Sequence, residues 1–541
     1  MASGSAEAGR KRGKNAREYG FRHGVVASTW AFEAQGPGSI PGGGAHAHQT
    51  NCRVGHVQGG GRLPMGRVVI VLAAGEGTRM RSDTPKVLHT ILGRTLIGHV
   101  LSATESLSAS ERVVVVGVKS EEVTSEVLKY DSAAKIARQE RRGGTGHAVR
   151  IALEQVACSD DSTVVVTAGD APLITAESLD RLVAMCASEQ VGAAVLTADV
   201  DDPHGYGRII RDPDNGILRI VEDKDANADE REVHEVNSSI YAFRAGALKN
   251  ALAEIKPDNA QAEEYLTDVI EIIRASGRKV APVVAADYFE ILGVNDRVQL
   301  AEATAIMRDR INLRWMAAGV TLIDPPTTFI DVTAELEGDV TIKAGCQIEG
   351  TSRIGRGALI GPDTRILNCE VGPDAVITKS ECVGATIGRH AQVGPYSFLR
   401  PGAHLGEGAK VGSFVEVKNS SIGAGSKVPH LSYIGDATIG VESNIGAGTI
   451  TANYDGVAKH RTVIGDHVRI GSDNILIAPV EVGDGAYTAA GSAITENVPP
   501  GAMGVGRGQQ RNILGWVGRK RAGSDSANAA DRAGNEEKGV K

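Results

Sequence analysis

The chain lacks paired-cysteine motifs, apolar runs of membrane length and an excess of positive charge. Its six cysteines are scattered, without a C-x-x-C motif or the Cys/His spacing of a metal site. This pattern favours free thiols in a reducing compartment. No run approaches the roughly 18 consecutive apolar residues of a membrane span, and the start has no apolar secretion segment. We therefore expect a cytoplasmic protein without a membrane partner.

Charge is distributed unevenly along the 541 residues. Residues 1–64 contain eight of the 58 Lys and Arg residues but only three of the 66 Asp and Glu residues, so residues 65–541 carry a net charge of −13. A body this acidic is a poor candidate for binding nucleic acid without regard to sequence. We expect small-molecule substrates and no nucleic-acid partner.

The first 64 residues do not have the pattern of a folded domain. Segments such as GPGSIPGGGAHAHQ are of low complexity, and hydrophobic periodicity is absent. Met65 stands directly before the first predicted strand. We interpret residues 1–64 as a disordered N-terminal extension or upstream sequence, with a basic targeting leader as the alternative.

Residues 65–294 alternate short β-branched runs with amphipathic segments, which predicts a Rossmann-like α/β domain with a mostly parallel sheet. Residues 295–319 predict a linker helix, since Asn295-Asp296 offers an N-cap and Gly319 a C-cap. The predicted strands of the domain are Val68–Leu72, Val113–Val116, Val164–Thr167 and Ala194–Thr197, and its predicted helices include Leu96–Leu107 and His147–Val156.

Residues 320–517 repeat with a period of six. A six-residue repeat of aliphatic residues is typical of a parallel β-helix, in which each coil buries its aliphatic ladder against its neighbours. We predict a left-handed parallel β-helix of hexapeptide repeats, interrupted by a loop at Thr449–Arg461, and then a disordered polar tail over 518–541. The ladder consists of Ile342, Ile348, Ile354, Ile360 and Ile366, then Ile387, Val393, Leu399, Leu405, Val411 and Val417, and finally Ile464, Ile470, Leu476 and Val482.

A glycine-rich turn follows the first strand directly. Ala73-Ala74-Gly75-Glu76-Gly77-Thr78-Arg79 lets the backbone approach a ligand, and Arg79 and Lys86 add positive charge. The turn departs from G-x-G-x-x-G because Met80 replaces the third glycine, and no G-x-x-x-x-G-K-[ST] motif occurs. We interpret it as a nucleotide or sugar-phosphate site at the carboxyl end of a parallel sheet. A turn that merely connects strand to helix is the alternative.

Two later segments belong to the same predicted sheet edge. GTGHA at 144–148 can open a helix whose N–H groups face a base or phosphate. Asp170 follows the strand Val164–Thr167, where a Mg²⁺ that bridges phosphates would need an oxygen ligand. On its own, Asp170 is equally consistent with a turn or N-cap residue.

These motifs resemble a known family. The turn is similar to the signature L-A-A-G-x-G-T-R-M…P-K of sugar-1-phosphate nucleotidyltransferases. From Val68 to Asn295 the chain resembles N-acetylglucosamine-1-phosphate uridylyltransferases, with PKVLH at 85–89, YGR at 206–208 and GVN at 293–295. The resemblance implies that Asp170 and Asn295 hold Mg²⁺. It also implies that UTP and the UDP-sugar contact Leu72, Ala73, Ala74, Gly75, Lys86, Gln139, Gly144, Thr145, Ala168, Gly169, Asp170, Gly207, Glu222, Asn237 and Asn295.

The chemistry of this implied reaction requires little proton transfer. The attacking sugar-phosphate oxygen is already charged at neutral pH, so positioning and charge neutralisation suffice, and Arg79 and Lys86 are the candidate catalytic cations. One departure is Ala168, where many relatives carry tyrosine. We expect it to change contacts and not the chemistry.

The β-helix carries polar residues that its fold does not require. A hexapeptide stack can serve only as a trimerisation stalk, but His430 stands among Arg400, Lys418, Tyr433 and Asn444 on neighbouring predicted coils. In bacteria, the uridylyltransferases named above resemble one half of a bifunctional enzyme. The positions on the β-helix resemble its other half, a glucosamine-1-phosphate N-acetyltransferase. The resemblance implies that His430 is the general base and that the other four bind glucosamine 1-phosphate in a homotrimer. It places acetyl-CoA against Ala447, Asn453, Tyr454, Ser472, Ala490 and Arg507.

The sequence therefore predicts an enzyme that acetylates glucosamine 1-phosphate and then uridylylates the product. A histidine, which titrates at about pH 6.5, suits deprotonation of the sugar amine. One alternative is a single-activity sugar-1-phosphate nucleotidyltransferase with a structural β-helix. Another is a non-catalytic regulatory subunit, against which Lys86, Asp170 and Asn295 argue.

Overall fold

The computed structural model describes residues 66–117, 120–257 and 263–539. The predicted N-terminal extension, residues 1–64, lies outside the described residues. No helix within these ranges is long and apolar enough to cross a lipid bilayer.

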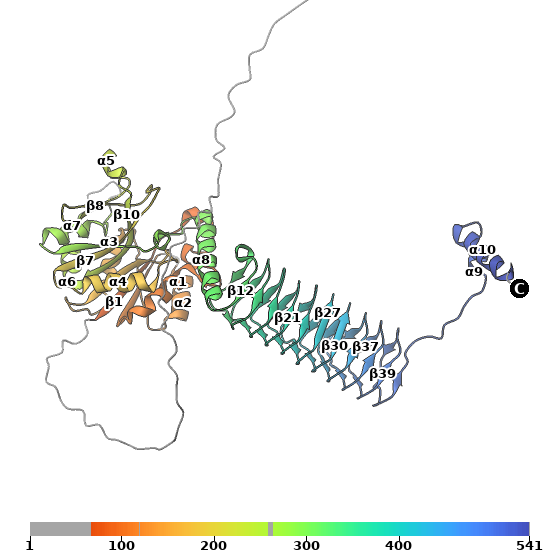
Figure 1. Cartoon of the computed structure of the whole chain (residues 1–541). Helices are drawn as coiled ribbons and strands as arrows, with labels where there is room; N and C mark the ends of the chain where they lie inside the picture. Colours follow the sequence, from red (N-terminus) through yellow and green to blue (C-terminus); the bar gives the residue numbers. More distant parts are fainter. Residues whose placement is uncertain (1–65, 118–119, 258–262, 540–541) are drawn as a thin grey trace, which may run out of the picture. The chain divides into compact units, whose positions relative to one another are not determined.

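The first domain is built on one twisted sheet with the strand order β11-β7-β10-β6-β1-β4-β5 (Figure 1). β1 pairs in parallel with β4 and β6, as predicted, whereas β10 runs antiparallel between β6 and β7. A β8–β9 hairpin pairs with β10 at one side. The strands are β1 (Arg67–Ala73), β4 (Glu111–Val116), β5 (Lys135–Arg138), β6 (Thr163–Ala168), β7 (Val191–Asp199), β8 (Arg208–Arg211), β9 (Ile217–Val221), β10 (Glu235–Arg244) and β11 (Lys279–Val284), besides the short pair β2 (Thr90–Ile91) and β3 (Arg94–Thr95).

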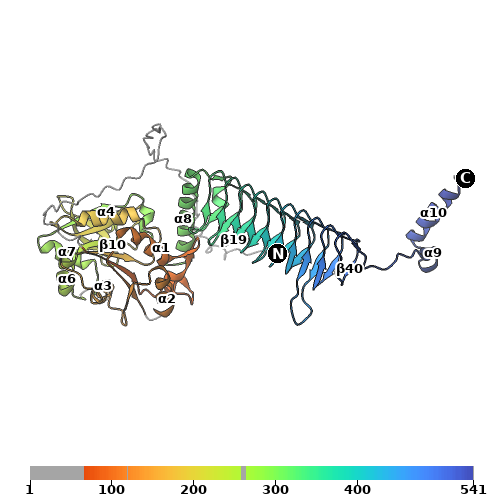
Figure 2. The same ribbon diagram turned by 90° about the horizontal axis from the view of Figure 1, so that it is seen from below.

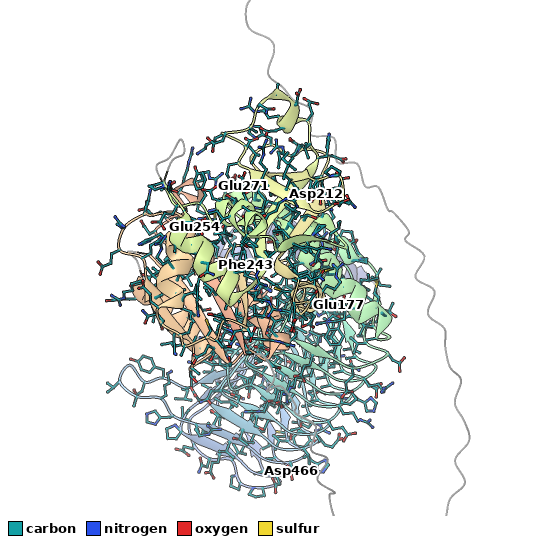
Figure 3. All side chains as sticks on the ribbon, turned by 90° about the vertical axis from the view of Figure 1, so that its left-hand side faces the viewer. Glu177, Asp212, Phe243, Glu254, Glu271 and Asp466 are labelled. Atoms are coloured by element: carbon teal, nitrogen blue, oxygen red, sulfur yellow. The ribbon has the colours of Figure 1, made fainter. Side chains whose placement is uncertain are left out.

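Helices cover both faces of this sheet because successive strand side chains point to opposite faces. Val68 and Ile70 pack with α3, α6 and α7, whereas Val69 and Val71 pack with α1, α2 and α4. Figure 3 shows Phe243 inside this domain, with Glu177, Glu254 and Glu271 toward its outside. The helices are α1 (Leu96–Ala103), α2 (Ser120–Tyr130), α3 (Thr145–Leu153), α4 (Ala176–Cys186), α5 (Ala228–Arg231), α6 (Ala245–Glu254) and α7 (Asp268–Ala275).

The helix α8 (Arg297–Ala317) follows the domain. The Asp296 carboxylate caps its start by accepting hydrogen bonds from the N–H groups of Val298 and Gln299, both at 2.9 Å. Gly319 adopts φ +93° just after its end. Both predicted ends of this helix are therefore found.

The β-helix consists of three parallel sheets of 11, 10 and 9 short strands, the architecture of a left-handed hexapeptide β-helix. The first sheet runs from β12 (Thr321–Leu322) to β41 (Met503–Gly504), the second from β13 (Phe329–Ile330) to β40 (Ala493–Ile494), and the third from β14 (Glu335–Leu336) to β38 (Val480–Val482). Every predicted ladder residue is buried inside the stack. The six-residue period thus predicts the core correctly.

The predicted interruption of the stack is shorter than expected. The segment Ile450–Ala452 forms strand β34 of the second sheet, so only residues 453–461 project as a loop (Figure 2). β34 stays in the stack because Thr451 is buried and its hydroxyl donates to the Gly435 carbonyl at 3.0 Å. The loop prediction was therefore wrong at Ile450–Ala452.

The tail differs from the expected disorder. Two helices, α9 (Trp516–Lys520) and α10 (Asp525–Gly539), lie in residues 516–539. The Ser524 hydroxyl accepts a hydrogen bond from the Ala527 N–H at 3.2 Å, and alanine-rich sequence follows it. A serine cap and alanines favour a helix locally, and Ala527 is buried.

Candidate functional site

The glycine-rich turn after β1 borders a cavity of about 690 Å³ at the carboxyl ends of the parallel strands. Residues from the turn, from the start of α3 and from the end of β6 meet there. Among the predicted site residues, its lining includes Leu72, Ala74, Gly75, Arg79, Lys86, Gln139, Gly144, Thr145, Ala168, Asp170 and Asn295. The structure therefore brings most of the predicted nucleotide-site residues together.

Two glycines in this cavity hold conformations that side chains disfavour. Gly77 adopts φ +62°, and a Cβ there would approach Lys86 Cβ to 2.5 Å. Gly144 adopts φ +93°, and a Cβ there would lie 2.4 Å from the Glu264 carbonyl oxygen. Glycine is required at both positions for the backbone to approach its neighbours.

Lys86, Asp170 and Asn295 converge although they are far apart in sequence. The Lys86 ammonium forms an ion pair with the Asp170 carboxylate and donates a hydrogen bond to Asn295 Oδ1 at 3.1 Å. The two predicted metal ligands therefore direct oxygens toward one point. A carboxylate and an amide oxygen fit Mg²⁺, which completes its shell with water and substrate phosphates. The described residues contain no group of three or more His, Cys, Asp or Glu that could hold a metal.

The start of α3 is held by side chains and backbone from two other segments. Gln139 Nε2 donates to the Gly144 carbonyl at 3.0 Å, and the Thr145 hydroxyl accepts from the Leu266 N–H at 2.9 Å. These contacts fix the N-terminal turn of α3 beside the cavity. The Gly146 N–H donates to the Glu264 carbonyl at 2.8 Å. The other N–H groups at the start of a helix favour an anion.

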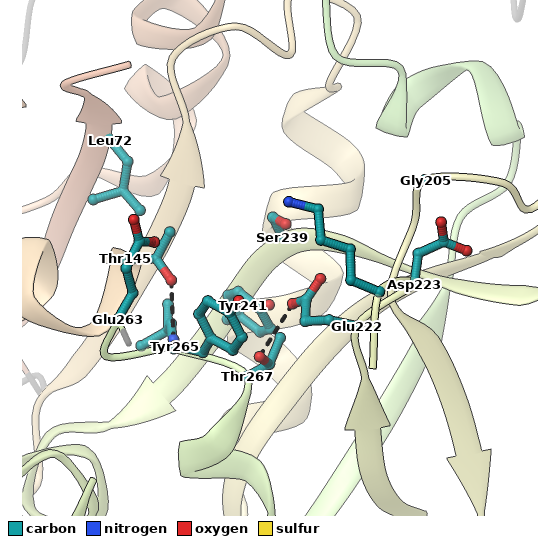
Figure 4. Close-up of a pocket in the computed structure, with 12 residues that line it drawn as sticks. Leu72, Thr145, Gly205, Glu222, Asp223, Ser239, Tyr241, Glu263, Tyr265 and Thr267 are labelled. Atoms are coloured by element: carbon teal, nitrogen blue, oxygen red, sulfur yellow. Dashed lines mark hydrogen bonds between the residues drawn. The ribbon is translucent and has the colours of Figure 1, made fainter. Parts of the chain in front are cut away.

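A second cavity of about 380 Å³ continues from the first (Figure 4). Glu222 lies in it and accepts a hydrogen bond from the Thr267 hydroxyl at 3.2 Å. Burial raises the pKa of Glu222 above its ordinary value, and the Thr267 hydrogen bond opposes this shift. The two cavities share four lining residues: Leu72, Thr145, Ser239 and Glu263. The cavities are therefore two parts of one cleft.

The other two residues predicted to bind the sugar lie beside Glu222. The Asn237 N–H donates to the Gly207 carbonyl at 2.8 Å, and Asn237 is buried. A Cβ on Gly207 would lie 3.7 Å from Glu222 Oε2. The three predicted residues are therefore brought together, and Glu222 among them lines the smaller cavity.

We expect Asp268→Asn to stabilise the protein above pH 6 and to have no effect below pH 4. Burial and the nearby Glu222 carboxylate raise the pKa of Asp268 to about 6. Its ionisation therefore opposes folding. The free energy of unfolding of the wild type falls as pH rises from the pKa of the unfolded state, about 4, through the pKa of the folded state. Because Asp268 is only partly buried and solvent weakens the effect, we expect a difference of about 1 kcal/mol in the free energy of unfolding at pH 7.

Thermal unfolding midpoints of both proteins between pH 4 and 8 test this expectation. Asp214→Asn, in the exposed turn between β8 and β9, serves as the control and should give a difference that does not change with pH. An Asp268→Asn difference that is equally independent of pH would contradict the prediction.

Several residues in the cleft were not anticipated from the sequence. Ser239, Tyr241 and Tyr265 line the smaller cavity. Arg142 and Glu76 form an ion pair at the larger one. Apart from Glu76, which belongs to the glycine-rich turn, no motif marks these residues, because a β-bulge and the return of distant segments bring them to the cleft.

On the β-helix, His430 lies at the corner between the first and second sheets. It ends strand β30 (Lys427–His430), is exposed, and its carbonyl accepts from the Gly448 N–H at 3.4 Å. The same corner continues on later coils, where Asp473 N–H donates to the Ala447 carbonyl at 2.6 Å. Ser472, Ala490 and Arg507 occupy it further along, through the bonds Gly491 N–H to Ser472 O at 2.8 Å and Arg507 Nη1 to Ala490 O at 3.0 Å.

The predicted sugar-phosphate residues lie on either side of this corner. Tyr433 begins strand β31 (Tyr433–Gly435) of the second sheet, while Arg400 and Lys418 stand at the far edge of that sheet on successive coils. Asn444 begins strand β33 (Asn444–Ile445) of the first sheet. One chain therefore does not bring all of them into one pocket around His430.

Asn453 and Tyr454 begin the projecting loop. Asn453 is buried and donates to Asp436, which also accepts from Asn419. Burial opposes the charge on Asp436, but these two hydrogen bonds help to hold its pKa below the ordinary value. The base of the loop is therefore fixed, while Tyr454 is exposed.

Comparisons with known proteins agree with both halves of this arrangement. The model of the MobA-like NTP transferase domain matches residues 69–232, and that of the GMPPB C-terminal domain matches residues 385–483. A protein of Streptomyces avermitilis named bifunctional protein GlmU is 53% identical over 472 residues, which are 87% of this chain and 98% of that protein. Proteins of the same name from Streptomyces coelicolor and Mycolicibacterium vanbaalenii are 52% and 49% identical over 472 and 463 residues, covering 87% and 85% of this chain and 98% and 94% of theirs.

Proposed function

Because this chain belongs to the family of bifunctional GlmU proteins, we propose that it catalyses acetyl transfer followed by uridylyl transfer. Acetyl-CoA acetylates glucosamine 1-phosphate, and UTP then reacts with the resulting N-acetylglucosamine 1-phosphate to give UDP-N-acetylglucosamine and pyrophosphate. The observation that carries this proposal is the convergence of Lys86, Asp170 and Asn295 in a cleft with two connected cavities. Both reactions would take place in the cytoplasm.

The connected cavities suit the two substrates of uridylyl transfer. The larger one, beside the glycine-rich turn and the start of α3, suits the nucleotide, and the smaller one, beside Glu222 and Asn237, suits the sugar. A phosphate oxygen of the sugar attacks the α-phosphorus of UTP while the bond to the β-phosphate breaks. Lys86 and Arg79 stabilise the charge that moves onto pyrophosphate.

Asp170 and Asn295 are the residues that would hold Mg²⁺. Their oxygens both face Lys86 Nζ, which supports a shared position for a cation. When bound, the metal supplies charge neutralisation between the phosphates of the nucleotide and the sugar. The segments that carry Asp170 and Asn295 are also joined directly, because the Val294 N–H donates to the Asp170 carbonyl at 2.9 Å. This bond keeps the two side chains close together without a metal.

His430 suits acetyl transfer because its imidazole is exposed at the corner that also carries the predicted acetyl-CoA residues. It accepts a proton from the ammonium group of glucosamine 1-phosphate, and the free amine attacks the thioester carbonyl carbon. The carbon–sulfur bond breaks and the thiolate of CoA takes up a proton. Arg400 and Lys418 neutralise the sugar phosphate.

We further propose that the active unit is a homotrimer. The separation of His430 from Arg400 and Lys418 across one sheet supports a site completed by a second copy. Exposed aromatic side chains support it too: the rings of Tyr396 and Phe414, 56% and 59% exposed, stack at 5.4 Å near the same corner. Apolar groups exposed at this level favour a protein contact.

Two assays on the purified full chain test the proposed function. Glucosamine 1-phosphate with acetyl-CoA should release free thiol, and N-acetylglucosamine 1-phosphate with UTP and Mg²⁺ should release pyrophosphate. Pyrophosphate release without thiol release would instead support a single-activity nucleotidyltransferase. Failure of both, with any sugar 1-phosphate, would support a regulatory subunit.

A further inference from the structure

Ser239 has a backbone conformation that is uncommon for serine. It lies in β10, where the pairing with β7 shifts register between Asn237 and Tyr241, and it adopts φ +62°. This left-handed region is unfavourable for residues other than glycine, asparagine and aspartate. Strain of this kind gathers at functional sites, where the surroundings hold it in place.

The bulge places Ser239 where the two cavities of the cleft join. Ser239 is exposed and lines both of them, and Figure 4 shows it among the residues that line the smaller one. Leu72 and Thr145 line the same junction. A group that joins the contents of the two cavities therefore passes Ser239.

A single amide holds the bulge from both ends. Asn237 Oδ1 accepts from the Ser239 N–H at 3.2 Å, and Asn237 Nδ2 donates to the Tyr241 hydroxyl at 2.8 Å. Tyr241 is only 2% exposed, and burial raises the pKa of its hydroxyl, which therefore remains neutral while it accepts this hydrogen bond. Because both ends of the Asn237 amide are engaged, Ser239 is held in one position.

We propose that Ser239 is a specificity-determining residue for the sugar phosphate, with its hydroxyl donating to a phosphate oxygen where the cavities join. This inference rests on the proposed uridylyl transfer. The Ser239 side chain also lies within hydrogen-bonding reach of the Tyr241 hydroxyl. Because a hydroxyl both donates and accepts, Ser239 Oγ can accept from the neutral tyrosine and direct its own proton toward the phosphate. Tyr241 is a positioning residue that acts through Asn237.

Ser239→Gly tests the proposal without disturbing the bulge. Glycine adopts φ +62° without strain, so the variant removes the hydroxymethyl group and leaves the backbone conformation in place. A hydrogen bond to a charged group is worth roughly a tenfold change or more. We expect the KM for N-acetylglucosamine 1-phosphate to rise about tenfold, while the KM for UTP and the rate of acetyl transfer stay within about twofold.

Ser108→Gly is the matched control. Ser108 also adopts a left-handed conformation, φ +46°, and is exposed, but it precedes β4 at the amino ends of the strands, opposite the cleft. Tyr241→Phe, which frees one end of the Asn237 amide, should raise the same KM without changing that for UTP.

Two results would overturn the assignment of Ser239 alone. One is a Ser239→Gly protein with the same KM values as Ser108→Gly, and the other is an equal rise in both KM values, which indicates a merely structural role. If the wild type transfers acetyl groups but releases no pyrophosphate, the proposed uridylyl transfer is itself wrong. The role of Ser239 would then fail with it.

Discussion

His430→Ala is expected to lower the rate of acetyl transfer by about 10²- to 10⁴-fold, the usual contribution of a general base. The amine of glucosamine 1-phosphate is largely protonated at neutral pH, so without an acceptor it attacks the thioester only through its small free fraction. Pyrophosphate release should be unchanged, because His430 lies on the β-helix and the nucleotide cleft lies in the α/β domain. Thiol release and pyrophosphate release from the same preparation measure the two rates.

His404→Ala is a suitable control for this variant. His404 is an exposed histidine in strand β26 (His404–Leu405) of the third sheet, away from the corner that carries His430. We expect it to retain acetyl transfer. Equal losses in the two variants, or a loss of pyrophosphate release in His430→Ala while its oligomeric state is unchanged, would contradict the role of His430.

Asp170→Asn is expected to produce the reverse pattern. The substitution keeps the shape of the side chain but removes the charge that pairs with Lys86 and would hold Mg²⁺. Because charge stabilisation in the transition state is the main requirement of this reaction, we expect pyrophosphate release to fall by about 10²-fold or more. Acetyl transfer should remain at the wild-type rate, since the β-helix does not depend on this carboxylate.

A control carboxylate lies near the other end of β6, the strand that Asp170 follows. Asp160 precedes β6, is exposed and pairs with Lys249, so Asp160→Asn should leave both activities intact. A thermal unfolding midpoint for each variant separates loss of function from loss of folding. If Asp170→Asn keeps pyrophosphate release within about threefold of the wild type, the proposed metal and charge role of Asp170 is wrong.

The repeat period was the most informative part of the sequence for the fold. Each ladder residue, such as Ile366 or Leu399, is buried only against its counterparts on adjacent coils, so burial follows directly from spacing. The direction of β10 was not predictable in this way. Its buried run Ile240–Phe243 indicates a central strand, but apolar residues alone do not distinguish a parallel from an antiparallel neighbour.

The candidate site was predictable where chemistry accompanies a strand end. Lys86 and Asp170 follow from the turn after β1 and from the end of β6, whereas Asn295, which is 209 residues from Lys86, required a resemblance to known proteins. Ser239 was missed because nothing in its local sequence indicates a left-handed backbone. The tail helix α10 was missed because its pattern has local helix propensity without an apolar face.

The loop at residues 453–461 leaves the order of the β-helix unchanged. Ala437 pairs with Thr462 and Ile439 with Ile464, so the register on the third sheet resumes directly after the loop. For a flexible loop, doubling its length costs only about 0.6 kcal/mol. We therefore expect the corner before Thr462 to tolerate an inserted segment. Such a segment would project from the β-helix, and the coils on both sides of it would keep their positions along the axis.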